Sequence, residues 1–295
     1  MFAADGGWAG PNQAFSYRIL SVGDRTADID HMPGGKFDSS KTRVRPVFDA
    51  LWARGRDWLP QLLALPTGGC ADAEIKSGDL TLIRGHWQPD EMCLDPPVSL
   101  LSWLIRNVIS RSAKAFDNEL RQRLADGDPN TIKHALRLLR TEPAQRAWYI
   151  FEGPTCPDVY IEARDALVVI EGKRTESNAT TDTTWLRGRH QIWRHIDAAW
   201  ELRGRRAVYG FFIVESDPAG SDGSVPEVWR EAAQACIHPE ALRTSFPHRS
   251  REEVIAISRC FLGVTTWRMV CERFQIDWRT LPHEVSSINT ESQRI

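Results

Sequence analysis

The sequence predicts an α/β protein in which helices flank a mixed central β-sheet, joined to a mostly helical N-terminal region. Short runs rich in Val, Ile, Phe and Tyr cluster between residues 147 and 215, which is typical of strands. One run, at residues 166–170, is apolar throughout, which favours a central strand covered on both faces. A segment with helical spacing of apolar residues precedes the last run, as expected for an α/β layer architecture.

The N-terminal region, residues 1–125, is expected to be helical and irregular, either as a separate subdomain or as an elaboration of the core. Its first 40 residues are rich in Gly, Asp and Ser with little periodicity, which favours irregular structure. Apolar spacing then predicts a helix over 42–64, weakened by Gly55, a strand over 80–84, and two helices over 98–125.

The second region, residues 126–295, is expected to form the α/β core with C-terminal helices. Its first helix is predicted over 129–140, because Asp128 can cap it and Pro129 suits the first helical position. Strands are predicted over 147–151, 159–163, 166–171 and 206–215, with a helix over 185–202. The sequence Ser-Arg-Glu-Glu at residues 250–253 has the pattern of a capping box and predicts another helix start.

The composition restricts the class of protein. A hydrophobic content of 42% and a charged content of 26% are ordinary for a soluble globular chain. A formal net charge of −2 argues against a generally basic coat, so any nucleic-acid surface must be local. The first residues lack signal-peptide features, and no apolar run approaches the ~20 residues of a membrane span. The six cysteines form no C-x-x-C pair and are interpreted as free thiols, so we expect a cytoplasmic protein without membrane contact.

Charged residues gather at one end of a predicted hairpin. If the chain turns about the bond between Arg164 and Asp165, paired residues have numbers that sum to 329, as those of Asp158 and Glu171 do. The two β-carbons would then lie about 5 Å apart. Lys173 lies two residues further on and projects from the same face. Like charges placed opposite each other destabilise a sheet, and a divalent cation would remove that cost.

These residue types suit metal-assisted hydrolysis of a phosphodiester bond. Asp158 and Glu171 carry the carboxylate oxygens that Mg²⁺ or Mn²⁺ prefers, and the backbone carbonyl of Gly172 offers a further oxygen. Such a cation lowers the pKa of a bound water and offsets charge on the phosphate. Lys173 is placed to hold the attacking water or to stabilise the phosphate oxygens.

The pattern Pro-Asp158, twelve residues, then Glu171-Gly-Lys173 resembles the signature of the PD-(D/E)XK, or restriction-endonuclease-like, nuclease superfamily. The resemblance covers roughly residues 130–215. It implies a restriction-endonuclease-like core in which Asp158 and Glu171 are metal ligands and Lys173 is the catalytic lysine. It further implies a Mg²⁺-dependent nuclease with nucleic acid as its partner, DNA being favoured over RNA, in restriction, defence or repair.

The helix predicted over 185–202 has a polar face that suits contact with a phosphate backbone. Members of the superfamily similar to RecB carry Gln-x-x-x-Tyr on this helix. Here Gln191 matches the glutamine and is an accessory candidate, whereas His stands where Tyr would be. The side chains expected to contact nucleic acid are Arg187, His190, Arg194 and His195. Each taken alone fits a solvated helix face equally well.

Many nucleases of this class use one more acid, from the helix before the first core strand, and no acid lies within 129–140 here. Glu142 and Glu119 are the accessory candidates that the resemblance suggests, although both also fit surface charge. Asp90 forms a second Pro-Asp pair, but no Glu-x-Lys strand follows it, so we exclude it as a site residue.

Other interpretations of the same residues remain open. Glu171 and Lys173 also fit the solvated end of a strand, and Asp158 fits a turn cap. A one-residue slip in register would put the two acids on opposite faces of the sheet. The alternative function is a non-catalytic nucleic-acid-binding or regulatory interaction protein that retains the nuclease-like fold.

Overall fold

The computed structural model describes residues 38–70, 72–76, 78–107, 118–141, 147–176, 186, 188–217 and 223–283. The chain divides into two compact units, Met1–Asp30 and His31–Ile295, and every described residue belongs to the second. The irregular structure expected for the first 40 residues therefore lies almost wholly outside the described residues.

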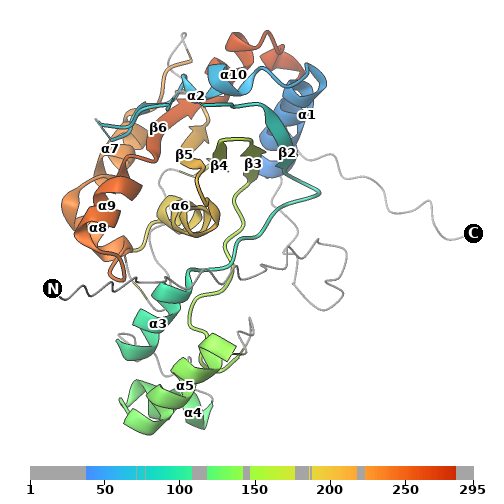
Figure 1. Ribbon diagram of the computed structural model, residues 1–295. Coiled ribbons are helices and arrows are strands. Elements are labelled where there is room, and N and C mark those ends of the chain that lie inside the picture. Colours follow the sequence, from blue (N-terminus) through green and yellow to red (C-terminus); the bar gives the residue numbers. More distant parts are fainter. Residues whose placement is uncertain are drawn as a thin grey trace, which may run out of the picture. The chain divides into compact units, whose positions relative to one another are not determined.

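A six-stranded mixed β-sheet lies at the centre of the second unit (Figure 1). Its strands are β1 (Thr67–Gly68), β2 (Leu82–His86), β3 (Val159–Ala163), β4 (Ala166–Gly172), β5 (Ala207–Val214) and β6 (Phe261–Thr266). The spatial order is β1-β6-β5-β4-β3-β2. Strands β4, β5 and β6 run parallel, whereas β3 is antiparallel to both of its neighbours and β1 is antiparallel to β6. The predicted mixed sheet is confirmed.

The helical elements are η2 (Ser40–Val44, a π-helix), α1 (Arg45–Ala53), α2 (Leu59–Leu63), α3 (Val98–Arg106), α4 (Glu119–Ala125), α5 (Pro129–Thr141), α6 (Gln191–Leu202), α7 (Glu227–Cys236), α8 (Pro239–Ser245), α9 (Arg251–Ser258), α10 (Trp267–Arg273) and η4 (Trp278–Thr280, a 3₁₀ helix). Within the described residues, no helix combines the length and the apolar character that crossing a membrane requires.

Two hydrophobic clusters cover the two faces of the sheet. On β4, Val168 and Ile170 pack with helices α1, α2 and α10, whereas Leu167 and Val169 pack with α6 and α7. Because successive side chains of a strand point to opposite faces, a strand covered on both sides must be apolar at every position. This explains the unbroken apolar run that predicted a central strand.

Elements from before residue 126 are built into this core. Strands β1 and β2 occupy the two edges of the sheet, and α1 and α2 pack on one of its faces. The unit His31–Ile295 therefore includes both sides of the expected boundary at residue 125, and these N-terminal elements elaborate the core. Helices α3, α4 and α5 bury their apolar residues in a third cluster of their own.

Several predicted elements differ from the observed ones. The helix expected over 42–64 is interrupted after α1, where Gly55 adopts a φ of 105° that favours glycine. The strand expected over 147–151 is a turn, because its apolar side chains pack among α3–α5 instead of in the sheet. Strand β6 was not predicted. Its apolar run is diluted by Gly263, which has no room for a Cβ against the backbone of Thr67.

Local capping signals in the sequence are confirmed. The backbone N–H of Thr131 donates to the Asp128 carboxylate over 2.8 Å, so Asp128 caps α5 as expected. Ser250 and Glu253 form a reciprocal capping box at the start of α9. Such signals act over three residues and so are visible without tertiary structure.

A buried cluster of charged side chains connects α6 with the residues just before α6 and just before α9. The Asp197 carboxylate contacts Arg189 at 2.9 Å, Arg249 at 2.9 Å and His248 at 3.2 Å. Burial alone would raise the pKa of Asp197, but the contact with His248 and the charges of Arg189 and Arg249 lower it far below its usual range. This carboxylate is therefore ionised and compensated inside the protein.

Replacing Asp197 with Ala should lower the free energy of unfolding by about 3–5 kcal/mol, because it leaves buried cations without a counter-charge. Urea unfolding at neutral pH measures the change. The matched control is Glu119→Gln, which removes an exposed pair with Arg123 and should cost less than ~1 kcal/mol. A loss for Asp197→Ala as small as the control's would show that the cluster contributes nothing to stability.

Candidate active site

The register of the β3–β4 hairpin places Asp158 and Glu171 on the same face of the sheet. Tyr160 pairs with Val169, so paired residues have numbers that sum to 329, as the sequence predicts. Both members of this pair belong to the hydrophobic cluster on the α6 side. Asp158 and Glu171 each lie two residues from the pair and therefore project toward α6 as well. The predicted register is confirmed, and the one-residue slip does not occur.

The Asp158 carboxylate is fixed by two hydrogen bonds at the end of the hairpin. One oxygen accepts from the backbone N–H of Gly172 over 2.8 Å, and the other accepts from the hydroxyl of Ser40 over 3.2 Å. Ser40 comes from η2, far away in the sequence, and nothing in its local sequence marks it as a site residue. Asp158 thus crosses to β4 and does not cap its own turn.

Glu171 and Lys173 form a buried ion pair beside Asp158. The Lys173 ammonium lies 2.9 Å from one oxygen of Glu171, and the side chains of both residues are at most 10% exposed. The other Glu171 oxygen lies 2.9 Å from the Nε2 atom of His195. Lys173 also donates to the Gln191 side chain over 3.3 Å. Because Glu171, Lys173 and His195 are buried, the interpretation as a solvated strand end is wrong.

The ionisation of the cluster is uneven. Burial and the charge of Glu171 raise the pKa of Asp158 well above its usual value, against the Gly172 N–H and the Lys173 charge. Burial raises the pKa of Glu171 too, but bonds from His195 and Lys173 outweigh it and the pKa falls. The pKa of Lys173 is raised, since the charge of Glu171 outweighs burial. The negative charge of Asp158 is therefore the one that lacks full compensation.

Gly172 brings its backbone to this site because it carries no side chain. A Cβ there would lie 2.7 Å from the Trp267 ring and 2.9 Å from Val44 on the opposite face of the sheet. Its N–H points to Asp158, and in a strand the N–H and C=O of one residue point the same way. The carbonyl oxygen of Gly172 therefore faces the Asp158 side, as a ligand role requires.

The described residues contain no group of three or more His, Cys, Asp or Glu side chains placed to hold a metal ion. A cation at this site would bind Asp158, Glu171, the Gly172 carbonyl and water. That donor set suits Mg²⁺, which usually keeps several waters and takes one or two carboxylates.

The side chains expected to contact nucleic acid differ in exposure and in position. His195 is only 1% exposed and lies inside the protein, so its expected surface role is wrong. From α6 it faces Glu171 on β4. Arg194 is partly exposed and pairs with Glu152 at 3.4 Å. His190 precedes α6, which begins at Gln191 and not at residue 185. Arg187 lies outside the described residues.

Of the accessory acids, Glu119 is the one that the structure describes, and it does not join the site. Glu119 is 79% exposed on α4 and pairs with Arg123 on its own helix. Glu142 lies outside the described residues. Glu152 is buried, and one of its oxygens contacts both Arg189 and Arg194. Asp90 is 70% exposed and its carboxylate lies 3.2 Å from His86. The next residue, Glu91, lies near enough for its charge to raise the pKa of Asp158.

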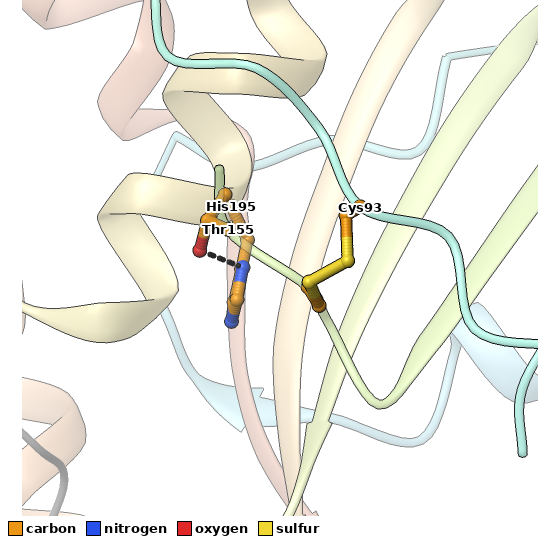
Figure 2. Close-up of a disulfide and its surroundings, with 4 residues drawn as sticks. Cys93, Thr155 and His195 are labelled. Atoms are coloured by element: carbon orange, nitrogen blue, oxygen red, sulfur yellow. Dashed lines mark hydrogen bonds between the residues drawn. A yellow bond between two sulfur atoms is a disulfide. The ribbon is translucent and has the colours of Figure 1, made fainter. Parts of the chain in front are cut away.

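A disulfide joins Cys93 to Cys156 next to the site (Figure 2). The expectation of six free thiols is therefore wrong for these two, whereas Cys70, Cys236, Cys260 and Cys271 are free. The partners are 63 residues apart in sequence, and spacing alone did not reveal them. An isolated antiparallel bridge between Leu94 and Thr155 brings them together. Disulfides persist in oxidising surroundings, so the thiols no longer support a cytoplasmic location.

Comparison of the chain with protein-family models, curated proteins and solved structures gave no match. The fold is an α/β mixed sheet with flanking helices. Its function is therefore inferred from the geometry around Asp158 and Glu171.

Replacing Asp158 with Asn should raise the melting temperature of the metal-free protein at neutral pH. The raised pKa means that ionising Asp158 costs stability as pH rises through that pKa, and Asn removes the charge while keeping an acceptor for Gly172. A gain of roughly 1 kcal/mol corresponds to about 2–4 °C. Below the unfolded carboxyl pKa of ~3.9 both forms are neutral and the difference should vanish.

Differential scanning calorimetry across pH, with and without Mg²⁺, measures this effect. Mg²⁺ should raise the melting temperature of the wild type and leave that of Asp158→Asn unchanged. A variant less stable than the wild type at pH 7, or equal stabilisation of both by Mg²⁺, would contradict the interpretation of Asp158 as an uncompensated ligand.

Proposed function

We propose that this protein is a metal-dependent nuclease that hydrolyses phosphodiester bonds, with DNA as its favoured substrate. One observation carries the proposal. Asp158 and Glu171 lie on one face of a paired hairpin with the Lys173 ammonium bound to Glu171; Glu171 and Lys173 are buried and Asp158 is half-buried. This is the residue set, order and strand placement that the PD-(D/E)XK resemblance calls for. The mixed sheet between helical layers is compatible with a restriction-endonuclease-like core.

The electrostatics favour a cation at this site. Two carboxylates face one ammonium, and the surplus negative charge falls on Asp158, whose pKa is raised by burial and by Glu171. Holding such a charge inside a protein is costly unless it is paired or bound to a metal. When bound, Mg²⁺ or Mn²⁺ would supply an activated water and positive charge beside the phosphate.

The chain's own residues have separate tasks in this proposal. Asp158, Glu171 and the carbonyl of Gly172 hold the cation. Lys173 is kept protonated by Glu171, so it acts as a hydrogen-bond donor and a positive charge toward the phosphate oxygens. Gln191 accepts from Lys173 and orients the ammonium from α6.

The substrate surface must be local, because the formal net charge of the chain is −2. Arg194 lies one turn into α6 on the site's side of the sheet and is partly exposed. It and His190 remain the described candidates for contact with the phosphate backbone. Arg187 belongs to the same proposal.

Replacing Lys173 with Met should lower the rate of Mg²⁺-dependent cleavage by about 10²–10³-fold, because the apolar chain fills the space without the charge. Plasmid, single-stranded DNA and RNA are incubated with each protein and either Mg²⁺ or Mn²⁺. The control is Lys133→Met, an exposed position on α5 that should retain wild-type activity.

The outcomes of this assay separate the candidate functions. Intact substrate with the wild type, alongside measurable binding, would favour a non-catalytic nucleic-acid-binding protein. Neither cleavage nor binding would favour a regulatory interaction protein. Equal cleavage by wild type and Lys173→Met would assign the activity to a contaminant or to another site.

A further inference from the structure

We propose that His195 is a positioning residue that orients Glu171 for cation binding, and that Thr155 holds the imidazole in place. The inference rests on the proposed metal site and adds two residues to it. Neither residue would touch the substrate or the cation; both act through the Glu171 carboxylate.

The contacts form a continuous chain from the loop before β3 to the carboxylate. His195 Nε2 lies 2.9 Å from Glu171, and His195 Nδ1 lies 2.8 Å from the Thr155 hydroxyl. Figure 2 shows the Thr155–His195 bond beside the disulfide. All three side chains are buried, with Thr155 at 6% exposure, His195 at 1% and Glu171 at 3%. The three groups are therefore shielded from bulk water.

The chemistry of the groups fixes who donates. An ionised carboxylate only accepts hydrogen bonds, so Nε2 of His195 donates to Glu171. With a neutral imidazole, the Thr155 hydroxyl then donates to Nδ1 and fixes the tautomer. A carboxylate has about four lone-pair directions, so one bond from His195 and one from Lys173 leave directions on Glu171 for a cation.

The segment that carries Thr155 is itself anchored. Thr155 and Leu94 exchange two backbone hydrogen bonds of 2.9 Å, and the next residue, Cys156, is cross-linked to Cys93. Asp158 follows three residues after Thr155. One short segment thus carries a proposed ligand, the hydroxyl that orients His195 and half of the disulfide.

Two substitutions of His195 that differ by one methylene test the proposal. The terminal amide nitrogen of Gln can reach the place of Nε2 and keep the bond to Glu171, whereas Asn reaches only the place of Nδ1. His195→Asn should weaken Mn²⁺ affinity by about 10–100-fold, and His195→Gln should keep most of it. If His195 only filled space, the Gln variant would have no advantage over the Asn variant in Mn²⁺ affinity.

Isothermal titration calorimetry with Mn²⁺ measures affinity without relying on activity. In the cleavage assay, His195→Asn should raise the Mn²⁺ concentration needed for half-maximal rate more than it lowers the rate at saturating Mn²⁺. Thr155→Val removes the hydroxyl at constant shape and should weaken Mn²⁺ binding less than His195→Asn. The double variant Cys93→Ser, Cys156→Ser should shift affinity in the same direction.

The matched control is His248→Asn. His248 is also a buried histidine beside a carboxylate, Asp197, but it lies in the structural charge cluster. It should lower the melting temperature and leave Mn²⁺ affinity unchanged.

The possible results decide the inference and the proposed function separately. Equal affinity in His195→Asn and His195→Gln, or a loss in His248→Asn as large as in His195→Asn, would overturn the positioning role. A wild type that binds Mn²⁺ without cleaving any substrate would overturn the proposed nuclease function. The Mn²⁺ affinities of the His195 variants would then still decide the positioning role. A wild type that does neither would overturn both.

Discussion

The register of one β-hairpin determines everything else at this site. Because strand side chains alternate between faces, a shift of one residue between β3 and β4 would send Asp158 and Glu171 to opposite sides of the sheet. The observed pairing keeps them together, and the apolar residues before and after them keep the register in place. The cost is a pair of like charges close together, which Lys173, His195 and the Gly172 N–H offset in part.

The sequence was sufficient for the parts of the structure that depend on near neighbours. The hairpin and the buried central strand follow from apolar patterning, and the register follows from the position of the polar turn between the two strands. The caps at Asp128 and Ser250 follow from short-range hydrogen bonding. The placement of Glu171 and Lys173 on one face could be predicted for the same reason, since the two residues are two apart on one strand.

The parts that were missed depend on contacts between distant segments. Ser40 reaches Asp158 across 118 residues, and Cys93 reaches Cys156 across 63. No local pattern distinguishes these residues from their neighbours. The burial of His195 was missed for a related reason. A polar residue in an otherwise mixed helix can be buried when a buried carboxylate needs a partner, and that need is visible only in three dimensions.

The contact from η2 has a further consequence. Ser40 donates its hydroxyl to Asp158, and Val44 packs over Gly172. Both residues belong to η2, so one side of the site is formed by a segment that lies more than a hundred residues earlier in the sequence. Long-range closures of this kind come late in folding, after their entropy cost is met by other contacts. Until that contact forms, Asp158 lacks the Ser40 hydroxyl, so the proposed cation site would be complete only in the fully folded protein.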